Sequence, residues 1–103
     1  MYNNNTSKRV RLLISLPVRC KLRVKHGVAI DEIYECFNNR ELGFLEDTRV
    51  EHFTKPPTLW FIARTDQHRL LKVVFMERSK QIYEIKTVYE PSHEEERLYS
   101  KYA

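Results

Sequence analysis

The side chains in this sequence that could do chemistry are cations, one histidine at a predicted helix end and one Glu-Arg pair at a predicted strand end. Lys25 and His26 precede a glycine, Arg69 opens a long apolar run, and Glu77-Arg78 closes that run. Metal-independent cleavage of RNA needs a group that takes the 2′-hydroxyl proton and cations that stabilise the charge on the phosphate. Histidine suits the proton transfer because its ordinary pKa of about 6.5 lies near neutrality, and arginine offers phosphate oxygens a planar fork.

Other catalytic signatures are missing from the sequence. It has no Gly-x-Ser-x-Gly motif, two glycines are too few for a phosphate-cradling loop, and no His/Cys set has metal-ligand spacing. Its three aspartates, Asp31, Asp47 and Asp66, disfavour magnesium chemistry, which needs clustered carboxylates. Cys20 and Cys36 lack a C-x-x-C spacing, so we expect free thiols rather than a disulfide or zinc site. We therefore predict neither a metal nor another cofactor.

Length and composition predict one globular domain. The chain has 103 residues, of which 42% are hydrophobic and 31% charged, values too apolar for a disordered chain. Residues 1–9 lack an apolar pattern and are predicted to be a disordered tail, which leaves residues 10–103 as the domain. No run approaches the roughly 20 apolar residues of a membrane span, and the polar start does not resemble a signal peptide. We expect a cytoplasmic protein without a membrane partner.

Positive charge is concentrated at one end of the chain. Residues 1–30 carry +7 and the whole chain +4, so the remainder, +4 minus +7, carries −3. Such a segment attracts phosphates or an acidic partner protein, although a solvated face that only maintains solubility is an alternative. Within it, Lys21 and Arg23 are candidate RNA contacts. Its seven cations are Lys8, Arg9, Arg11, Arg19, Lys21, Arg23 and Lys25.

The first thirty residues predict a strand followed by a short helix. Residues 10–15 are apolar and β-branched, which favours a strand ending before Pro17. Residues 18–25 alternate apolar and basic side chains with period 2, which alone is typical of a strand. The neighbouring residues favour a helix instead, because Ser15 is a suitable N-cap, Pro17 fits a first turn and Gly27 suits a C-terminal cap.

A second helix is predicted over residues 29–39, followed by a strand-like piece and a loop over 41–57. Acidic residues in the first turns of this helix favour its start. Its apolar residues recur at i, i+3, i+4 and i+7, which places them on one face. These residues are Ile30, Ile33, Tyr34 and Phe37.

Three strands, at 58–64, 69–76 and 81–89, are joined by short polar turns and predict an antiparallel meander. The middle strand is apolar on both faces, as expected for a central strand covered on both sides. Leu71, Val73 and Phe75 are predicted on one face and Leu70, Val74 and Met76 on the other. The fold class is therefore α+β.

The chain is predicted to end in a helix. Ser92 and Glu95 have the spacing of a capping box, in which each side chain bonds the other residue's backbone N–H. Leu98 and Tyr102 lie four residues apart, so we expect this pair to pack the helix on the domain.

Three blocks in the same order carry a family resemblance. They are Lys-His-Gly-Val-Ala-Ile-Asp-Glu-Ile-Tyr-Glu-Cys-Phe at 25–37, Arg-Leu-Leu-Lys-Val-Val-Phe-Met-Glu-Arg at 69–78 and Ile-Lys-Thr-Val-Tyr-Glu-Pro at 85–91. With the terminal Glu-Arg-Leu-Tyr helix they resemble the BrnT toxins of the RelE-like superfamily, over residues 10–102. The segment 56–61 is more similar to a divergent subgroup often labelled ADP-ribosyl-(dinitrogen reductase) hydrolases. Those hydrolases are larger helical magnesium proteins, which three aspartates in a β-rich chain cannot reproduce.

The resemblance implies a RelE-like α+β fold and a metal-independent endoribonuclease that arrests translation. It also implies neutralisation by a cognate antitoxin, as a homodimer or a toxin–antitoxin hetero-oligomer. By motif position the catalytic residues would be Lys25, His26, Arg69, Glu77 and Arg78, with Arg64 as a further RNA contact.

In this hypothesis His26 transfers protons, while Lys25, Arg69 and Arg78 hold the scissile phosphate. Glu77 either orients an arginine or serves as the base. The family commonly caps the second helix with Ser or Thr where this chain has Ala29, a loss of about 1 kcal/mol. A second hypothesis is a non-catalytic module whose basic segment binds nucleic acid or an acidic protein.

Several residues have competing interpretations. His52, His68 and His93 are expected to be solvated. Aromatic residues of the predicted sheet either stack RNA bases or pack the core. These residues are Trp60, Phe61, Tyr83 and Tyr89, and Tyr99 and Tyr102 of the last helix present the same choice.

Overall fold

The computed structural model describes residues 10–49 and 54–103, and this part of the chain has the predicted α+β class. The predicted tail and His52 lie outside the described residues. None of the helices in the two described ranges is long and apolar enough to cross a membrane. In chain order, the elements are β1 (Arg11–Leu13), α1 (Leu16–Lys21), η2 (Leu22–His26), α2 (Ile30–Asn39), β2 (Leu45–Glu46), β3 (Thr58–Arg64), β4 (Leu70–Ser79), β5 (Ile82–Tyr89) and α3 (His93–Tyr102).

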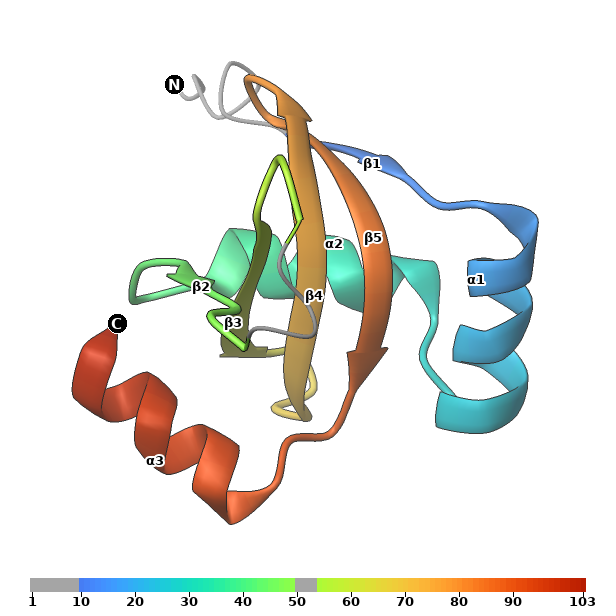
Figure 1. Ribbon diagram of the computed structural model, residues 1–103. Coiled ribbons are helices and arrows are strands. Elements are labelled where there is room, and N and C mark those ends of the chain that lie inside the picture. Colours follow the sequence, from blue (N-terminus) through green and yellow to red (C-terminus); the bar gives the residue numbers. More distant parts are fainter. Residues whose placement is uncertain (1–9, 50–53) are drawn as a thin grey trace, which may run out of the picture.

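The strands form one sheet in the order β1-β5-β4-β3-β2 (Figure 1). The predicted meander is confirmed, since β3, β4 and β5 pair antiparallel with β4 in the centre. β1 pairs with the start of β5 in the parallel direction, and β2 adds a short antiparallel edge beside β3. Helix α2 crosses one face of the sheet, and α3 lies on the other side (Figure 1).

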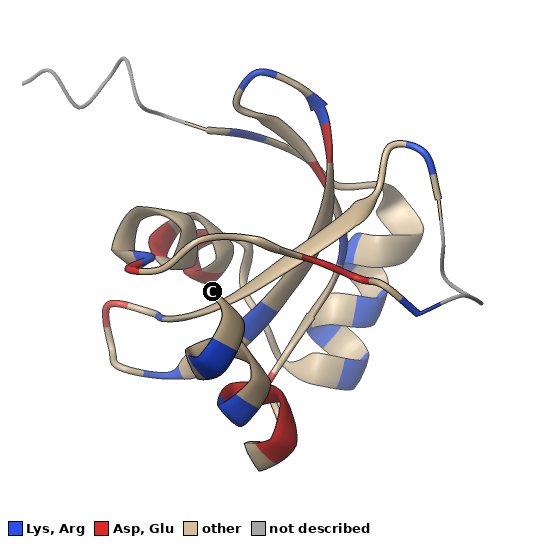
Figure 2. Ribbon diagram, turned by 60° about the vertical axis from the view of Figure 1, so that its left-hand side comes forward, with Lys and Arg blue, Asp and Glu red and all other residues tan. Residues whose placement is uncertain are grey.

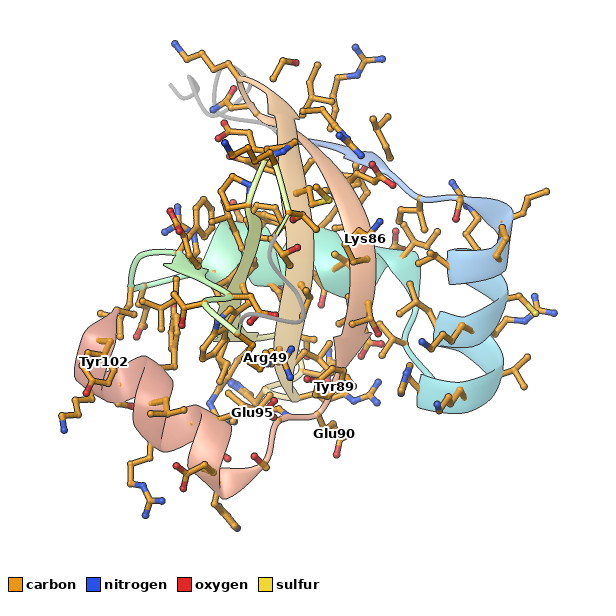
Figure 3. All side chains as sticks on the ribbon, in the orientation of Figure 1. Arg49, Lys86, Tyr89, Glu90, Glu95 and Tyr102 are labelled. Atoms are coloured by element: carbon orange, nitrogen blue, oxygen red, sulfur yellow. The ribbon has the colours of Figure 1, made fainter. Side chains whose placement is uncertain are left out.

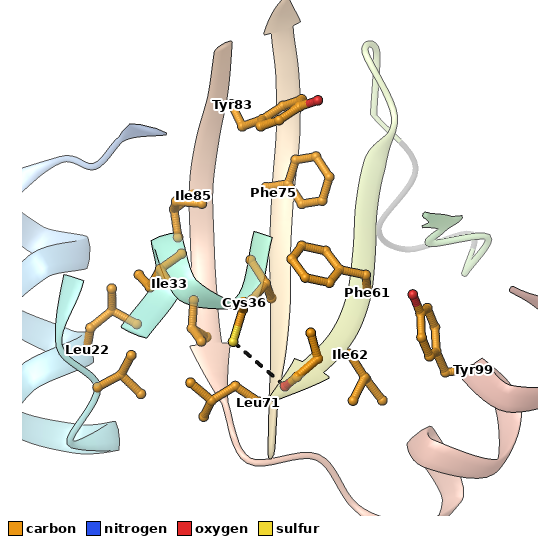
Figure 4. Close-up of a cluster of buried hydrophobic side chains, with 14 residues drawn as sticks. Leu22, Ile33, Cys36, Phe61, Ile62, Leu71, Phe75, Tyr83, Ile85 and Tyr99 are labelled. Atoms are coloured by element: carbon orange, nitrogen blue, oxygen red, sulfur yellow. Dashed lines mark hydrogen bonds between the residues drawn. The ribbon is translucent and has the colours of Figure 1, made fainter. Parts of the chain in front are cut away.

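The main core lies between α2 and the sheet. Leu71, Val73 and Phe75 of β4 are fully buried there, as predicted (Figure 4). The Cys36 thiol of α2 donates a hydrogen bond to the Ala63 carbonyl oxygen at 3.7 Å. Burial, reinforced by nearby carboxylates, raises the pKa of Cys36 to about 12, so this thiol is unreactive. Of the residues predicted on the opposite face of β4, Leu70 and Val74 are partly buried and Met76 is buried.

The segment that alternates with period 2 is helical. The Val18 N–H donates to the Ser15 hydroxyl, and Gly27 ends the segment with a φ of 60° in the left-handed region that favours glycine. Its last turn, η2, is a π-helix that continues α1. In α2 the Ala29 N–H donates to Glu32 Oε1 at 2.9 Å, so half of a capping box persists without a capping side chain at position 29.

The capping box of α3 is confirmed, but the predicted packing residues of that helix are wrong. Ser92 Oγ accepts from the Glu95 N–H, and Glu95 Oε1 accepts from the Ser92 N–H. The buried residue is Tyr99, whose hydroxyl donates to the Gly43 carbonyl oxygen and whose ring lies beside Trp60. Leu98 and Tyr102 are 41% and 63% exposed. The four-residue spacing places Leu98 and Tyr102 on one face of α3. The face that packs on the domain is the neighbouring one, because Tyr99 there contacts Gly43 and Trp60.

Candidate functional site

Arg69 lies just before β4, where the ends of three other elements meet. Its Nε donates to Glu90 Oε2 at 3.0 Å, beyond the end of β5. Its Nη1 donates to the Gly27 carbonyl oxygen at 2.8 Å and to Glu32 Oε1 at 3.1 Å. Its Nη2 donates to the His26 carbonyl oxygen at 3.2 Å. The guanidinium therefore ties η2, the first turn of α2 and the end of β5 to the central strand.

The charges around Arg69 indicate a positioning role. Burial alone would lower the pKa of Arg69, but the hydrogen bonds and charges of Glu90 and Glu32 outweigh this effect and raise it. Two carboxylates against one guanidinium leave a net negative charge, which repels a phosphate. The sequence hypothesis assigned Arg69 to the phosphate, whereas its contacts make it the clamp that holds the backbone of His26.

His26 ends η2 as predicted, and its ring lies beside the ring of Tyr89. The two ring centroids are 5.9 Å apart with an interplanar angle of 38°. Burial lowers the pKa of His26, and the cationic side chains of Lys25 and Lys21 lower it further. The imidazole is consequently neutral near pH 7, the form that accepts a proton.

A groove of about 960 Å³ lies on the face of the sheet opposite α2, and Figure 3 labels Lys86, Tyr89, Glu95 and Tyr102 among its lining residues. His26 does not line this groove. Tyr89 lines the groove and contacts His26, so it connects the two. One wall is the segment 45–49, and the other is formed by Glu95, Leu98 and Tyr102 of α3. The floor consists of Trp60, Lys72, Val74, Lys86, Thr87 and Tyr89.

Lys72 is a buried cation in the floor of this groove. Its side chain is 11% exposed, and its Nζ donates to Glu95 Oε2 at 2.8 Å. The same Nζ lies 4.4 Å from the centroid of the Trp60 ring and 5.6 Å from that of Tyr89. The Tyr89 hydroxyl also donates to Glu95 Oε2, at 3.0 Å.

Hydrogen bonds keep Glu95 ionised in this setting. Burial alone would raise the pKa of Glu95, but hydrogen bonds from Lys72, the Ser92 backbone N–H and Tyr89 hold it at about 2. The carboxylate is therefore charged across the physiological range and cannot act as a general acid. The negative charge of Glu95 is neutralised by the ion pair with Lys72. This ion pair links α3 to β4.

Glu77 and Arg78 lie at the other end of β4, away from His26. Arg78 lies nine positions after Arg69, which corresponds to roughly 30 Å along an extended strand. Arg78 Nε donates to Glu84 Oε1 at 2.7 Å, and this hydrogen bond lowers the pKa of Glu84. The structure thus keeps Lys25, His26 and Arg69 together but does not bring Glu77 or Arg78 to them.

The proposed RNA contacts are also dispersed. Arg64 ends β3, and its Nη1 donates to the His68 carbonyl oxygen at 2.9 Å beside a second cavity of about 610 Å³. Lys21 and Arg23 are exposed on the helix formed by α1 and η2. His68 is exposed as predicted.

The sheet aromatics lie in two different places. Phe61 and Tyr83 are buried in the core, whereas Trp60 and Tyr89 line the groove. Of the α3 aromatics, Tyr99 is buried and Tyr102 faces the groove. His93, on the same helix, has a fully exposed side chain, as predicted.

Sequence reasoning missed Lys72 and Glu95. A lysine between apolar neighbours in the middle of a predicted central strand is unusual, because lysine is rarely buried without a partner. A lysine at this position indicates either an ion pair or a functional site on the face of the sheet opposite α2. The pattern could not identify the partner, since Glu95 lies 23 residues further along the chain.

Comparisons with known proteins do not assign this chain to a family. No model of a known protein family matches the chain, and no curated protein matches it. Within residues 10–49 and 54–103, no group of three or more His, Cys, Asp or Glu side chains could hold a metal ion.

Proposed function

We propose that this chain is a metal-independent endoribonuclease in which His26 is the base and the groove on the open sheet face holds RNA. The observation that carries the proposal is the placement of His26, a half-buried imidazole whose ring lies beside Tyr89 of the groove and whose pKa is lowered by burial. The groove itself is lined by aromatic rings, three cations and three carboxylates. His26 retains the proton-transfer role expected from the sequence. Lys25 keeps the phosphate-binding role expected from the sequence, whereas Arg69 and Arg78 lose it because carboxylates already pair with them.

The composition of the groove supports a single-stranded RNA ligand. Unpaired bases stack on aromatic side chains, and Trp60, Tyr89 and Tyr102 offer such rings along it. Lys72 in the floor is paired with Glu95, and its Nζ lies over the rings of Trp60 and Tyr89, so it positions these rings and does not bind a phosphate. Lys25 is exposed next to His26 and is free to approach a phosphate outside the groove.

The reaction that this arrangement can perform is an internal transesterification. The neutral imidazole of His26 takes the proton of the 2′-hydroxyl, and the 2′-oxygen attacks the adjacent phosphorus. Lys25 stabilises the additional negative charge on the phosphate oxygens. The bond from phosphorus to the 5′-oxygen breaks, and that oxygen takes a proton from solvent. The products are a 2′,3′-cyclic phosphate and a 5′-hydroxyl.

The test is cleavage of a mixed-sequence 20-nucleotide RNA by the purified chain in EDTA. We expect cyclic-phosphate products, and we expect His26→Ala to reduce the rate by about 10²- to 10⁴-fold. The matched control is His93→Ala, which removes an exposed histidine and should leave the rate unchanged. Equal cleavage by His26→Ala, or of an all-deoxy strand, would overturn the mechanism.

We further propose that the chain is a cytoplasmic toxin with a RelE-like fold, neutralised by an antitoxin encoded beside it. Support comes from the three sequence blocks that resemble BrnT toxins and from the order of strands and helices. Expression should arrest bacterial growth, and His26→Ala should relieve the arrest. Normal growth with intact RNA would contradict this role.

A further inference from the structure

The helix formed by α1 and η2 has four rows of side chains, each with a spacing of four residues. An α-helix has 3.6 residues per turn and a π-turn has more, so a segment combining them keeps residues i and i+4 aligned. A sequence that alternates apolar and basic residues then separates into two apolar and two basic rows. Val18 and Leu22 form the inner apolar row, which packs against the core.

The outer apolar row consists of Leu16, Cys20 and Val24, and it faces solvent. Leu16 is 80% exposed and Val24 76%, and Cys20 between them is also exposed. The two basic rows flank it, with Arg19 and Arg23 on one side and Lys21 and Lys25 on the other. Figure 2 shows Lys and Arg along this helix, and residues 10–30 contain no Asp or Glu.

We propose that this surface binds an acidic amphipathic helix of a partner protein. Apolar side chains at i, i+4 and i+8 form a ridge of the kind that packs into the groove between side-chain ridges of a second helix. The basic rows on both sides of the outer row would form ion pairs with carboxylates on both sides of an apolar row of the partner helix. Charged residues that flank the apolar contact do the same in coiled coils. The inference rests on the exposed outer row and not on the cleavage chemistry, although Lys25 belongs to both proposed surfaces.

Other occupants fit this surface less well. A second copy would bring cationic rows against cationic rows, because a two-fold interface pairs a patch with itself. The outer row is only about 12 Å long and has no aromatic residue, whereas helices that lie on membranes commonly bury Trp, Phe or Leu over a larger face. RNA would use the cations but gain nothing from exposed Leu16 and Val24.

Cys20 reports directly on occupancy of the outer row. Its alkylation by iodoacetamide can be followed by mass spectrometry in the unmodified chain, since Cys36 is buried with a raised pKa. The probes are a 20-residue peptide with a leucine row between glutamate rows and an isomer of the same composition without rows. The other two are vesicles of phosphatidylcholine and phosphatidylglycerol and a 20-nucleotide RNA.

We expect the row peptide, at ten times its Kd, to slow alkylation of Cys20 about tenfold, and the other three probes to leave it within about twofold. The double variant Leu16→Ser/Val24→Ser should abolish this protection. Leu42→Ser, at an exposed leucine elsewhere, is the matched control and should retain it. Equal protection by the isomer, stronger protection by vesicles or RNA, or full protection in the double variant would overturn the proposal.

Discussion

The two ends of β4 carry the same residue type in opposite surroundings. At its start, Arg69 is 28% exposed and donates to two carboxylates and two carbonyl oxygens from three other elements. Near its end, Arg78 is 43% exposed and pairs with Glu84 on the adjacent strand. The first arginine joins parts of the chain that are distant in sequence, and the second joins neighbouring strands of one hairpin.

This difference shows that residue type does not define a role. The sequence hypothesis gave both arginines to one phosphate, but a strand of this length separates them. What makes one end a candidate site is the convergence of η2, β5 and α3 around it.

Arg69→Gln should lower the free energy of unfolding by about 3 kcal/mol, because the carbonyl oxygens of His26 and Gly27 and two carboxylates lose a charged donor. Urea denaturation measures this loss. A loss no greater than that of Arg78→Gln would contradict the clamp.

Glu95→Gln should lower the free energy of unfolding by about 2 kcal/mol at pH 7. The pKa of Glu95 is about 2 in the folded protein and ordinarily 4.5, so its contribution is complete above pH 4.5 and is lost as the pH falls toward 2. The gap between variant and wild type should therefore close over that range. Glu94→Gln, on the exposed first turn of α3, is the control and should show no such closure.

Arg78→Gln should cost less than about 1 kcal/mol, since its ion pair is partly exposed to solvent. It should also raise the pKa of Glu84 toward its ordinary value by removing the hydrogen bond that lowers it. An NMR titration of the Glu84 carboxyl measures this change. An unchanged pKa would show that the pair does not form in solution.

Lys25→Gln should raise the pKa of His26 toward its ordinary value. The change should be the smallest of the four, because burial is the main cause of the lowered pKa and Lys25 only the second. NMR titration of the imidazole detects it, and the acid limb of any cleavage rate should move in the same direction. Lys80→Gln, beyond the far end of β4, should leave the imidazole unaffected.

Local signals predicted much of the fold. The Ser15 and Gly27 caps located the first helix, and the Ser92–Glu95 box located the last. These signals are reliable because both partners lie within a few residues of each other. The site was predicted less well. Lys25 and His26 were found at a helix end, but the proximity of the His26 ring to Tyr89 depends on how η2 packs beside β5.

The sequence alone determined the types and approximate limits of the elements, through caps, turns and periodicity that act over a few residues. It also determined the basic character of the α1–η2 helix, since no acid occurs there. Only the tertiary structure decided that Tyr99 packs instead of Leu98 and that Lys72 pairs with Glu95. Those outcomes depend on contacts between segments distant in sequence, and the same local pattern is compatible with several such arrangements.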